Sequence, residues 1–399
     1  MGFQTMISTA AAKAIIAQNI PVRAPVLLPL SQAAGLTLAA DVYATTDIPA
    51  YPQSSMDGYA FSFSGWQAHH TLTIAGEMAA GQQQALEVNP QQAVRIFTGA
   101  AVPPGADTVV MQEKIRTENG QLIIEDEKLR SGANVRPQGS EIQSGALALP
   151  KDSRLTPAAI GFLAGIGTAE VLVYPRPSVS IIITGNELQS LGHPLKYGQV
   201  YESNSFALTA ALQQLHMNQV NVQRVQDDPD AVTEVLQQAL QRSDVVLLTG
   251  GISVGDYDFV LQAASRCGVV PLFHKVRQRP GKPLYFGKKE EKLVFGLPGN
   301  PSSVLSCFYL YVVPALEQWS RHSLGLRTIQ APIGKPYQKA AGLTHFLKGY
   351  YNGQTATPMD AQESYRMRSF ARANCLIQID ESITECLSGT LVDVHLLPT

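Results

Sequence analysis

Three segments combine glycine-rich turns with polar or charged side chains, a composition that suits an anion-binding site. They are IIITGNEL (181–188), LLTGGISVGDYD (247–258) and FGLPGNPSSV (295–304). Each begins with apolar residues, and its glycines leave backbone N–H groups free to converge on negative charge. In the third segment Pro298 and Pro301 fix the backbone, and Pro301 can begin a helix. The alternative for this segment alone is a helix-start turn that binds no ligand.

Four cations stand within eight residues just upstream of the third segment. They belong to FHKVRQRPGKP and are Lys275, Arg277, Arg279 and Lys282, in a chain whose net charge is only −2. Concentrated positive charge beside glycine turns suits phosphate or another oxyanion. A solvated basic loop would have the same composition, so this segment by itself leaves both interpretations open.

Carboxylates recur at the same strand ends: Glu187, the pair Asp227 and Asp228, and Asp256 with Asp258. Beside phosphate-binding turns they indicate a hard cation such as Mg²⁺, which would bridge protein and phosphate oxygens. Asp228 precedes Pro229, and a helix cap is the simpler interpretation of that residue. The sequence has no His/Cys cluster with zinc spacing, and no P-loop, GxGxxG or GxSxG motif.

The scaffold for these turns is predicted from the alternation of apolar runs and helical patterns over residues 178–326. The pattern predicts a doubly wound, mostly parallel α/β domain with its ligands at the carboxyl ends of the strands. We expect strands at 179–184, 220–225, 245–249 and 269–275, and helices at 205–215, 231–242 and 259–267.

A chain of 399 residues is too long for one core, so further domains are expected around the α/β domain. Short β-type runs separated by Gly, Pro and Asn predict a small β domain over 47–142. A linking domain is split between 1–46 and 143–177, and contains an N-terminal helix and a helix that Thr156 caps. Residues 327–399 form a C-terminal β domain. The predicted fold class is therefore multidomain α/β with β.

The composition is that of an ordinary globular protein, with 45% hydrophobic and 16% charged residues. It argues against a disordered chain and against nucleic acid as a partner. The first twenty residues fit an amphipathic helix better than a secretory signal, and the apolar stretch at 158–173 is too interrupted to cross a membrane. The cysteines form no CxxC pair and favour a reducing compartment, so we expect a cytoplasmic protein; they are Cys267, Cys307, Cys375 and Cys386.

Taken together, the motifs resemble those of the molybdopterin molybdenumtransferase (MoeA) family, to which the catalytic domain of gephyrin belongs. The resemblance covers nearly the whole chain in order, through SSMDGYA (54–60), FTGAAVPPGADTVVMQE (97–113), IIITGNEL, LLTGGISVGDYD, RPGKP and GLPGNP. It implies an enzyme that takes adenylylated molybdopterin and molybdate, inserts molybdenum at the dithiolene and releases the cofactor and AMP. The reaction is expected to need a divalent metal, usually Mg²⁺.

The same resemblance implies a homodimer of elongated four-domain subunits, with an elongated linking domain. The active cleft would lie between the α/β domain of one subunit and the small β domain of the other. Transient contacts with the upstream adenylyltransferase and with acceptor molybdoenzymes are further expectations.

Roles for single residues follow from the resemblance together with the turns and cations above. The expected catalytic residues are Asp57, Thr98, Glu187, Asp227 and Asp258, and the last three would also hold the metal. Substrate contacts are expected from Arg136, Glu141, Gly250, Gly251, Ser253, Gly255, Lys275, Arg279, Lys282, Pro298, Gly299, Asn300, Pro301, Lys348 and Ser369.

Some positions depart from the family pattern. Asn186 stands where aspartate is common, Arg279 where lysine is frequent, and RPQGSE matches the family's RRRGED only loosely. Arg368 replaces a common serine, and this extra cation is expected to alter the molybdate pocket.

Two alternative functions share the α/β domain. The upstream adenylyltransferase would lack both the SMDGYA domain and the C-terminal β domain. A non-catalytic scaffold on the same fold would carry a linker or a receptor-binding extension, and nothing in this sequence resembles one.

Overall fold

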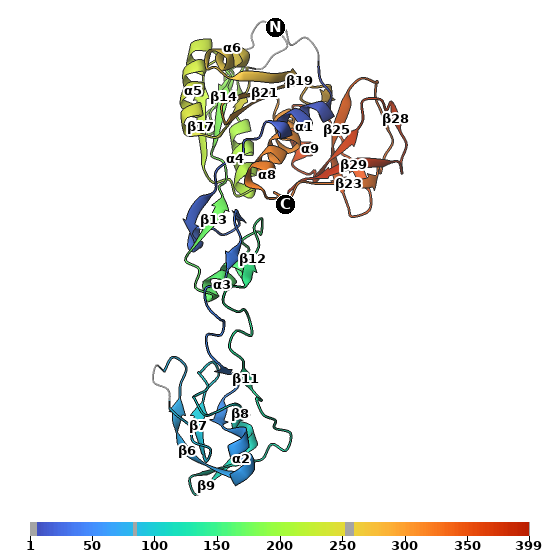
Figure 1. Ribbon diagram of the computed structural model, residues 1–399. Helices are drawn as coiled ribbons and strands as arrows, with labels where there is room; N and C mark the ends of the chain where they lie inside the picture. Colours follow the sequence, from blue (N-terminus) through green and yellow to red (C-terminus); the bar gives the residue numbers. More distant parts are fainter. Residues whose placement is uncertain (1–5, 83–85, 252–258, 399) are drawn as a thin grey trace. The chain divides into compact units, whose positions relative to one another are not determined.

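The computed structural model describes residues 6–82, 86–251 and 259–398 (Figure 1). The chain forms two compact units, one made of Met1–Val26 with Tyr174–Thr399 and the other of Leu27–Val173. Within the described ranges, no helix has the length and apolar character needed to cross a membrane. The finer division into four domains stays a prediction.

The first unit is built on a six-stranded sheet with the strand order β17-β14-β18-β22-β21-β19. The only antiparallel member is β21 (Pro283–Lys289), which pairs with β22 and β19. The other strands are β14 (Val179–Thr184), β17 (Val220–Val225), β18 (Val245–Thr249), β19 (Val270–Lys275) and β22 (Lys292–Leu297). The predicted mostly parallel sheet is confirmed. The hairpin of β21 and β22 was not predicted, because a charged turn at 288–292 interrupts its apolar pattern.

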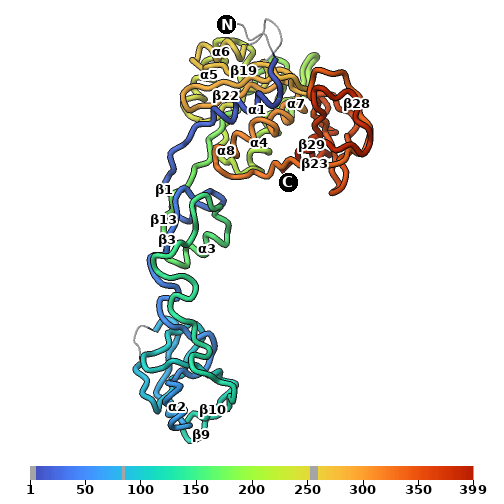
Figure 2. The backbone as a smooth tube through the Cα atoms, turned by 45° about the vertical axis from the view of Figure 1, so that its right-hand side comes forward, coloured from blue at the N-terminus to red at the C-terminus, as the bar shows by residue number. Residues whose placement is uncertain are grey.

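Helices cover both faces of this sheet because alternate residues of a strand point to opposite faces. Ile182 and Val246 pack with helices α5 and α6, whereas Ile181 and Leu247 belong to the core on the other face. That second face is covered by α1, α4 and one long helical segment (Figures 1 and 2). The helices are α1 (Thr9–Gln18), α4 (Asn204–Gln214), α5 (Pro229–Arg242) and α6 (Phe259–Arg266), and the long segment comprises α7 (Pro301–Cys307), a π-helical turn η3 (Phe308–Val312) and α8 (Val313–Ser320).

Two of the predicted helix starts are explained by local chemistry. The Oδ1 atom of Asp228 accepts hydrogen bonds from the backbone N–H groups of Asp230 (3.1 Å) and Ala231 (2.8 Å). The interpretation of Asp228 as a helix cap is therefore confirmed. Helix α7 begins at Pro301, whose missing N–H group would have no partner at that position anyway.

The C-terminal part of the first unit is a β sheet with the order β20-β25-β27-β29-β23, to which β26 adds at β25. Strand β20 (Gln278–Arg279) comes from the basic segment and pairs in parallel with β25. The basic segment therefore connects the two sheets: Lys275 ends β19 of the α/β sheet, and Gln278 and Arg279 form β20 of the C-terminal sheet. The other strands are β23 (Arg327–Pro332), β25 (Thr344–Tyr351), β26 (Ala356–Pro358), β27 (Cys375–Ile379) and β29 (Leu391–Leu396), with the pair β24 (Tyr337–Gln338) and β28 (Glu385–Cys386) and the short helix α9 (Met367–Phe370) beside them.

The second unit contains a six-stranded sheet with the order β8-β5-β7-β6-β10-β9, which agrees with the β character predicted there. Its strands are β5 (Gly58–Phe61), β6 (Thr71–Met78), β7 (Gln92–Ile96), β8 (Thr108–Met111), β9 (Ile115–Glu118) and β10 (Gln121–Ile124). Helix α2 (Phe63–His69), which was not predicted, follows β5.

The second unit has a separate apolar core. Its residues come from the chain before the six-stranded sheet, such as Leu38, and from the chain after it, such as Leu163. Helix α3 (Pro157–Gly165) contributes to it, and the Thr156 hydroxyl accepts a hydrogen bond from the N–H group of Ala159, as the predicted cap requires. The strands around this core and next to it are β1 (Val26–Pro29), β2 (Thr37–Leu38), β3 (Val42–Tyr43), β4 (Gln53–Ser54), β11 (Val135–Arg136), β12 (Leu147–Leu149) and β13 (Glu170–Tyr174).

Candidate functional site

A cavity of about 930 Å³ lies at the carboxyl ends of β14, β18 and β22. Residues Thr184, Gly250 and Pro298, which end or follow these three strands, all line it. Eight residues predicted from the sequence meet in its wall: Glu187, Gly250, Arg279, Lys282, Pro298, Gly299, Asn300 and Pro301. The segments quoted at the outset therefore share one hollow, as ligand sites of parallel α/β sheets do.

Two glycine turns form the base of the cavity. Gly250 has φ 84°, and a Cβ atom there would lie 2.2 Å from the carbonyl oxygen of Thr184. Both observations exclude any residue with a side chain. A Cβ atom at Gly299 would have the Cα atom of Gly250 as its nearest neighbour, at 3.8 Å, so the two turns face each other.

The PGNP turn is held by the segments on either side of it. Asn300 Nδ2 donates to the Ser364 hydroxyl at 2.9 Å, and the Ser302 N–H group donates to the Ser364 carbonyl oxygen at 3.1 Å. From the other side, Asn204 Nδ2 donates to the carbonyl oxygen of Gly299 at 2.9 Å. These hydrogen bonds therefore fix the conformation of the turn before any ligand binds.

Of the four cations in the basic segment, Arg279 and Lys282 line the cavity. Neither forms an ion pair with any residue in the described ranges. Arg277 instead pairs with Glu381, with 2.9 Å between Arg277 Nε and Glu381 Oε2. Lys275 ends β19 and does not line the cavity. The segment thus contributes two cations whose charge is available to an anion.

Two of the acidic residues expected to hold a metal, Glu187 and Asp227, follow the neighbouring parallel strands β14 and β17. Glu187 lines the cavity. Asp227 Oδ2 accepts from the Asn186 N–H group at 3.2 Å, and the Asp227 N–H group donates to Asn186 Oδ1 at 3.2 Å. The second carboxylate oxygen of Asp227, Oδ1, is buried without a hydrogen-bond partner, and a metal ion would satisfy such an atom. Asp258 lies outside the described residues, and the described ranges contain no group of three or more His, Cys, Asp or Glu that could hold a metal.

Lys348 and Ser369 do not line the cavity but support its wall. Lys348 is buried, and its Nζ donates to three carbonyl oxygens, at 2.8 Å to Ala361, 3.3 Å to Glu363 and 3.0 Å to Arg366. Burial lowers the pKa of the Lys348 ammonium group, against the opposing effect of Glu363. The Ser369 hydroxyl donates to Ala361 O at 2.9 Å. Both side chains hold the loop whose residues 362–365 face the cavity.

Several cavity residues were missed by the sequence analysis: Tyr201, Asn204, Gln278, Ser364 and Tyr365. Gln278 lies within the basic segment, but it is uncharged and was not singled out there. The other four belong to no glycine turn or cluster of charge, so no local signal singled them out. Arg368 is exposed on α9 and does not line the cavity, so its charge is not in the cavity wall.

The remaining predicted residues fall elsewhere. Gly251 (φ 62°) continues the turn of Gly250 without lining the cavity. Ser253 and Gly255, like Asp258, lie outside the described residues. Arg136 (in β11) and Glu141 are exposed residues of the second unit.

The second unit carries a carboxylate held in one orientation. The backbone N–H group and the hydroxyl of Thr98 each donate to Asp57 Oδ1 at 2.8 Å. These two bonds, with a smaller effect from Arg95, lower the pKa of the Asp57 carboxyl group. The Arg95 guanidinium group lies over the rings of Tyr59 (5.2 Å) and Phe97 (5.4 Å). Asp57 is therefore an exposed, ionised and oriented group.

Comparisons with known protein families match three successive regions of the chain. Residues 7–167 match the MoeA N-terminal region (domain I and II), residues 180–318 the probable molybdopterin binding domain, and residues 330–397 the MoeA C-terminal region (domain IV). The matches at both ends do not favour the upstream adenylyltransferase as the alternative.

Relatives named molybdopterin molybdenumtransferase cover nearly the whole chain. The protein from Haemophilus influenzae is 32% identical over 381 residues, covering 92% of this chain and 93% of that protein. The protein from Nostoc sp. is 35% identical over 389 residues, covering 93% and 88%. A crystal structure of the molybdopterin biosynthesis MoeA protein from Pyrococcus horikoshii superposes with a TM-score of 0.74 at 27% identity, covering 98% of this chain and 100% of that chain. The chain belongs to the molybdopterin molybdenumtransferase (MoeA) family.

Proposed function

We propose that this chain inserts molybdate into adenylylated molybdopterin and releases the molybdenum cofactor and AMP. The observation that carries the proposal is the cavity in which two glycine turns face each other beside Arg279 and Lys282. Such a site suits a substrate with several negative charges, because fixed backbone donors and cations stabilise charge without reorganising.

The cations, the Ser364 hydroxyl and the glycine turns each have a part in this reaction. Arg279 and Lys282 neutralise the oxygens of molybdate and of the substrate phosphates. The Ser364 hydroxyl accepts from Asn300, so its own proton is available to a substrate oxygen. The fixed turns hold the dithiolene and the molybdate near each other, so that positioning supplies much of the rate.

Magnesium is part of the proposal. Glu187 and Asp227 would hold it, since the buried Asp227 Oδ1 lacks a partner and both residues follow strands at the same sheet edge. When bound, it would polarise the phosphoanhydride and neutralise charge that develops on the leaving AMP.

The proposal includes a homodimer in which Asp57 and Thr98 of a second copy complete the active cleft. Its support is the exposed and oriented Asp57 carboxylate, which has no role in the core of its own unit. The enzyme would act in the cytoplasm and meet the upstream adenylyltransferase and the acceptor molybdoenzymes only transiently.

The test is to incubate the purified chain with adenylylated molybdopterin, Mg²⁺ and molybdate and to measure AMP release. Release should require molybdate and should stop when a chelator removes the metal. The variant Asp57→Ala should lose turnover and keep its unfolding temperature, whereas the control Glu127→Ala, at another exposed carboxylate of the second unit, should keep both. AMP release that is independent of molybdate would refute the proposal.

A further inference from the structure

A buried glutamine lies directly before the first of the two cavity cations. Gln278 precedes Arg279 in β20, lines the cavity and is only 1% exposed. Both ends of its side-chain amide are used: Oε1 accepts from the hydroxyl of Tyr311, and Nε2 donates to the carbonyl oxygen of Gly281 at 2.9 Å. The second bond ties the Gln278 side chain to the backbone of the turn that runs from Gln278 to Lys282.

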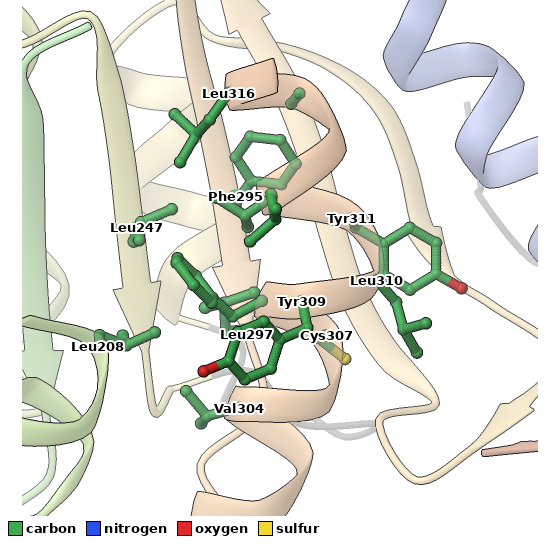
Figure 3. Close-up of a cluster of buried hydrophobic side chains, with 14 of the residues drawn as sticks. Leu208, Leu247, Phe295, Leu297, Val304, Cys307, Tyr309, Leu310, Tyr311 and Leu316 are labelled. Carbon is green, nitrogen blue, oxygen red and sulfur yellow. The ribbon is translucent and has the colours of Figure 1, made fainter. Parts of the chain in front are cut away.

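The partner hydroxyl comes from the π-helical turn η3. Tyr311 is 1% exposed and lies on the side of the helical segment away from Leu208 and Leu247 (Figure 3). Such turns interrupt the regular spacing of an α-helix and are frequent at functional sites. Because the hydroxyl is buried, it needs a hydrogen-bond partner, and Gln278 supplies it.

The turn is also seated tightly on the helix below it. Gly281 has φ 81°, and a Cβ atom there would lie 2.4 Å from Cys307 Sγ and 3.1 Å from Gln278 Nε2. The Val276 N–H group donates to the Lys282 carbonyl oxygen at 3.0 Å and closes the base of the turn. The backbone that carries Arg279 and Lys282 therefore has little freedom to shift.

We propose that Gln278 and Tyr311 are positioning residues for the anion site, which fix the turn so that Arg279 and Lys282 converge on a substrate oxyanion. The inference deepens the proposed function and rests on it for the identity of the anion. The competing explanation is a buried polar pair that only stabilises the fold. The two explanations differ in what they predict for a double variant in which both side chains are apolar. An apolar pair can restore the stability of the fold, but it cannot restore the hydrogen bond to Gly281 that fixes the turn.

The experiment compares the full-length wild type with Gln278→Met, Tyr311→Phe and the double variant. It measures thermal unfolding, the dissociation constants for molybdate and inorganic phosphate by calorimetry, and kcat and KM for molybdate. We expect Gln278→Met and the double variant to raise the dissociation constants and KM about tenfold, with a smaller change in kcat. The double variant should unfold closer to the wild-type temperature than either single variant.

A matched control is the buried hydroxyl pair of Ser180 and Ser243, 2.7 Å apart and remote from the cavity lining. Its double alanine variant should change stability and leave oxyanion binding unchanged. The inference is overturned if oxyanion affinity is unchanged in Gln278→Met, if the control shifts it equally, or if the wild type binds neither anion. Intact oxyanion binding without molybdate-dependent AMP release would instead count against the proposed function alone.

Discussion

Asn300 Nδ2 donates a hydrogen bond to Ser364 Oγ at 2.9 Å, which links the PGNP turn of the α/β sheet to a loop of the C-terminal β sheet. The two residues are 64 positions apart, and both line the cavity. The bond fixes the orientation of the Ser364 hydroxyl because its oxygen accepts from Asn300. The proton of that hydroxyl is then free to point at a ligand.

Replacement of Ser364 by alanine should weaken molybdate binding. A hydrogen bond to a charged group contributes about 1.5–3 kcal/mol, which corresponds to roughly a 10- to 150-fold rise in KM for molybdate. Steady-state AMP release at varied molybdate concentration measures the effect. Ser388→Ala, at an exposed serine that bonds only Gly334, is the control and should behave as wild type. An unchanged KM in Ser364→Ala would show that this hydroxyl faces no substrate oxygen.

Lys348→Met should destabilise the chain. The substitution leaves three carbonyl oxygens without their donor beneath the cavity loop, and we expect a loss of about 3 kcal/mol in the free energy of unfolding. Urea unfolding measures it, with the exposed Lys335→Met as the control. Full stability together with a large loss of molybdate affinity would mean that the Lys348 charge acts on the substrate instead.

Acidification should destabilise the first unit below neutral pH through two buried histidines. Burial, aided by Lys339 and Arg279, lowers the pKa of His345 to about 4, and burial, aided by Lys13, lowers that of His395 to about 3. An unfolded histidine has a pKa of about 6.5, so on acidification the unfolded state takes up protons first. This contribution to stability is complete above about pH 6.5 and falls as the pH drops toward 4, by up to roughly 1.4 kcal/mol per pH unit for each histidine.

Urea unfolding at pH 7, 6 and 5 tests this dependence. His345→Gln and His395→Gln should each reduce the slope of stability against pH, because each removes one group that takes up a proton on unfolding. His193→Gln, at an exposed histidine, serves as the control. A free energy of unfolding that increases as the pH falls from 7 to 5 would contradict the expected sign.

Asn186→Asp should strengthen the response to magnesium. The substitution preserves the acceptor for the Asp227 N–H group and places a second carboxylate beside Asp227. When a chelator is present, repulsion between the two carboxylates should lower the unfolding temperature of the variant. A divalent cation should restore that temperature, and it should bind roughly tenfold more tightly than to the wild type. Calorimetry with Mg²⁺ measures the affinity. The control is Asn352→Asp, which keeps its acceptor role in an exposed turn, and an equal response of both variants would argue against a metal at Asp227.

The sequence was informative wherever neighbouring residues determine the structure. The β-branched run at 179–184 became β14, the apolar run at 245–249 became β18, and Asp228 and Pro301 begin helices as their local chemistry requires. Parallel strands end at the same sheet edge, so the turns that follow them could be expected to meet. The resemblance of the motifs to a family added the functional expectation.

The sequence by itself determined the mostly parallel sheet, the glycine turns at its edge and the family, because these follow from periodicity, from turn chemistry and from motifs of contiguous residues. Only the tertiary structure decided which cations face the cavity. Arg277 turns to Glu381, Lys348 is enclosed by carbonyl oxygens, and Gln278 meets a tyrosine 33 residues away. These outcomes depend on side chains brought together from distant parts of the chain, where burial forces each polar group to find a partner that no local pattern specifies.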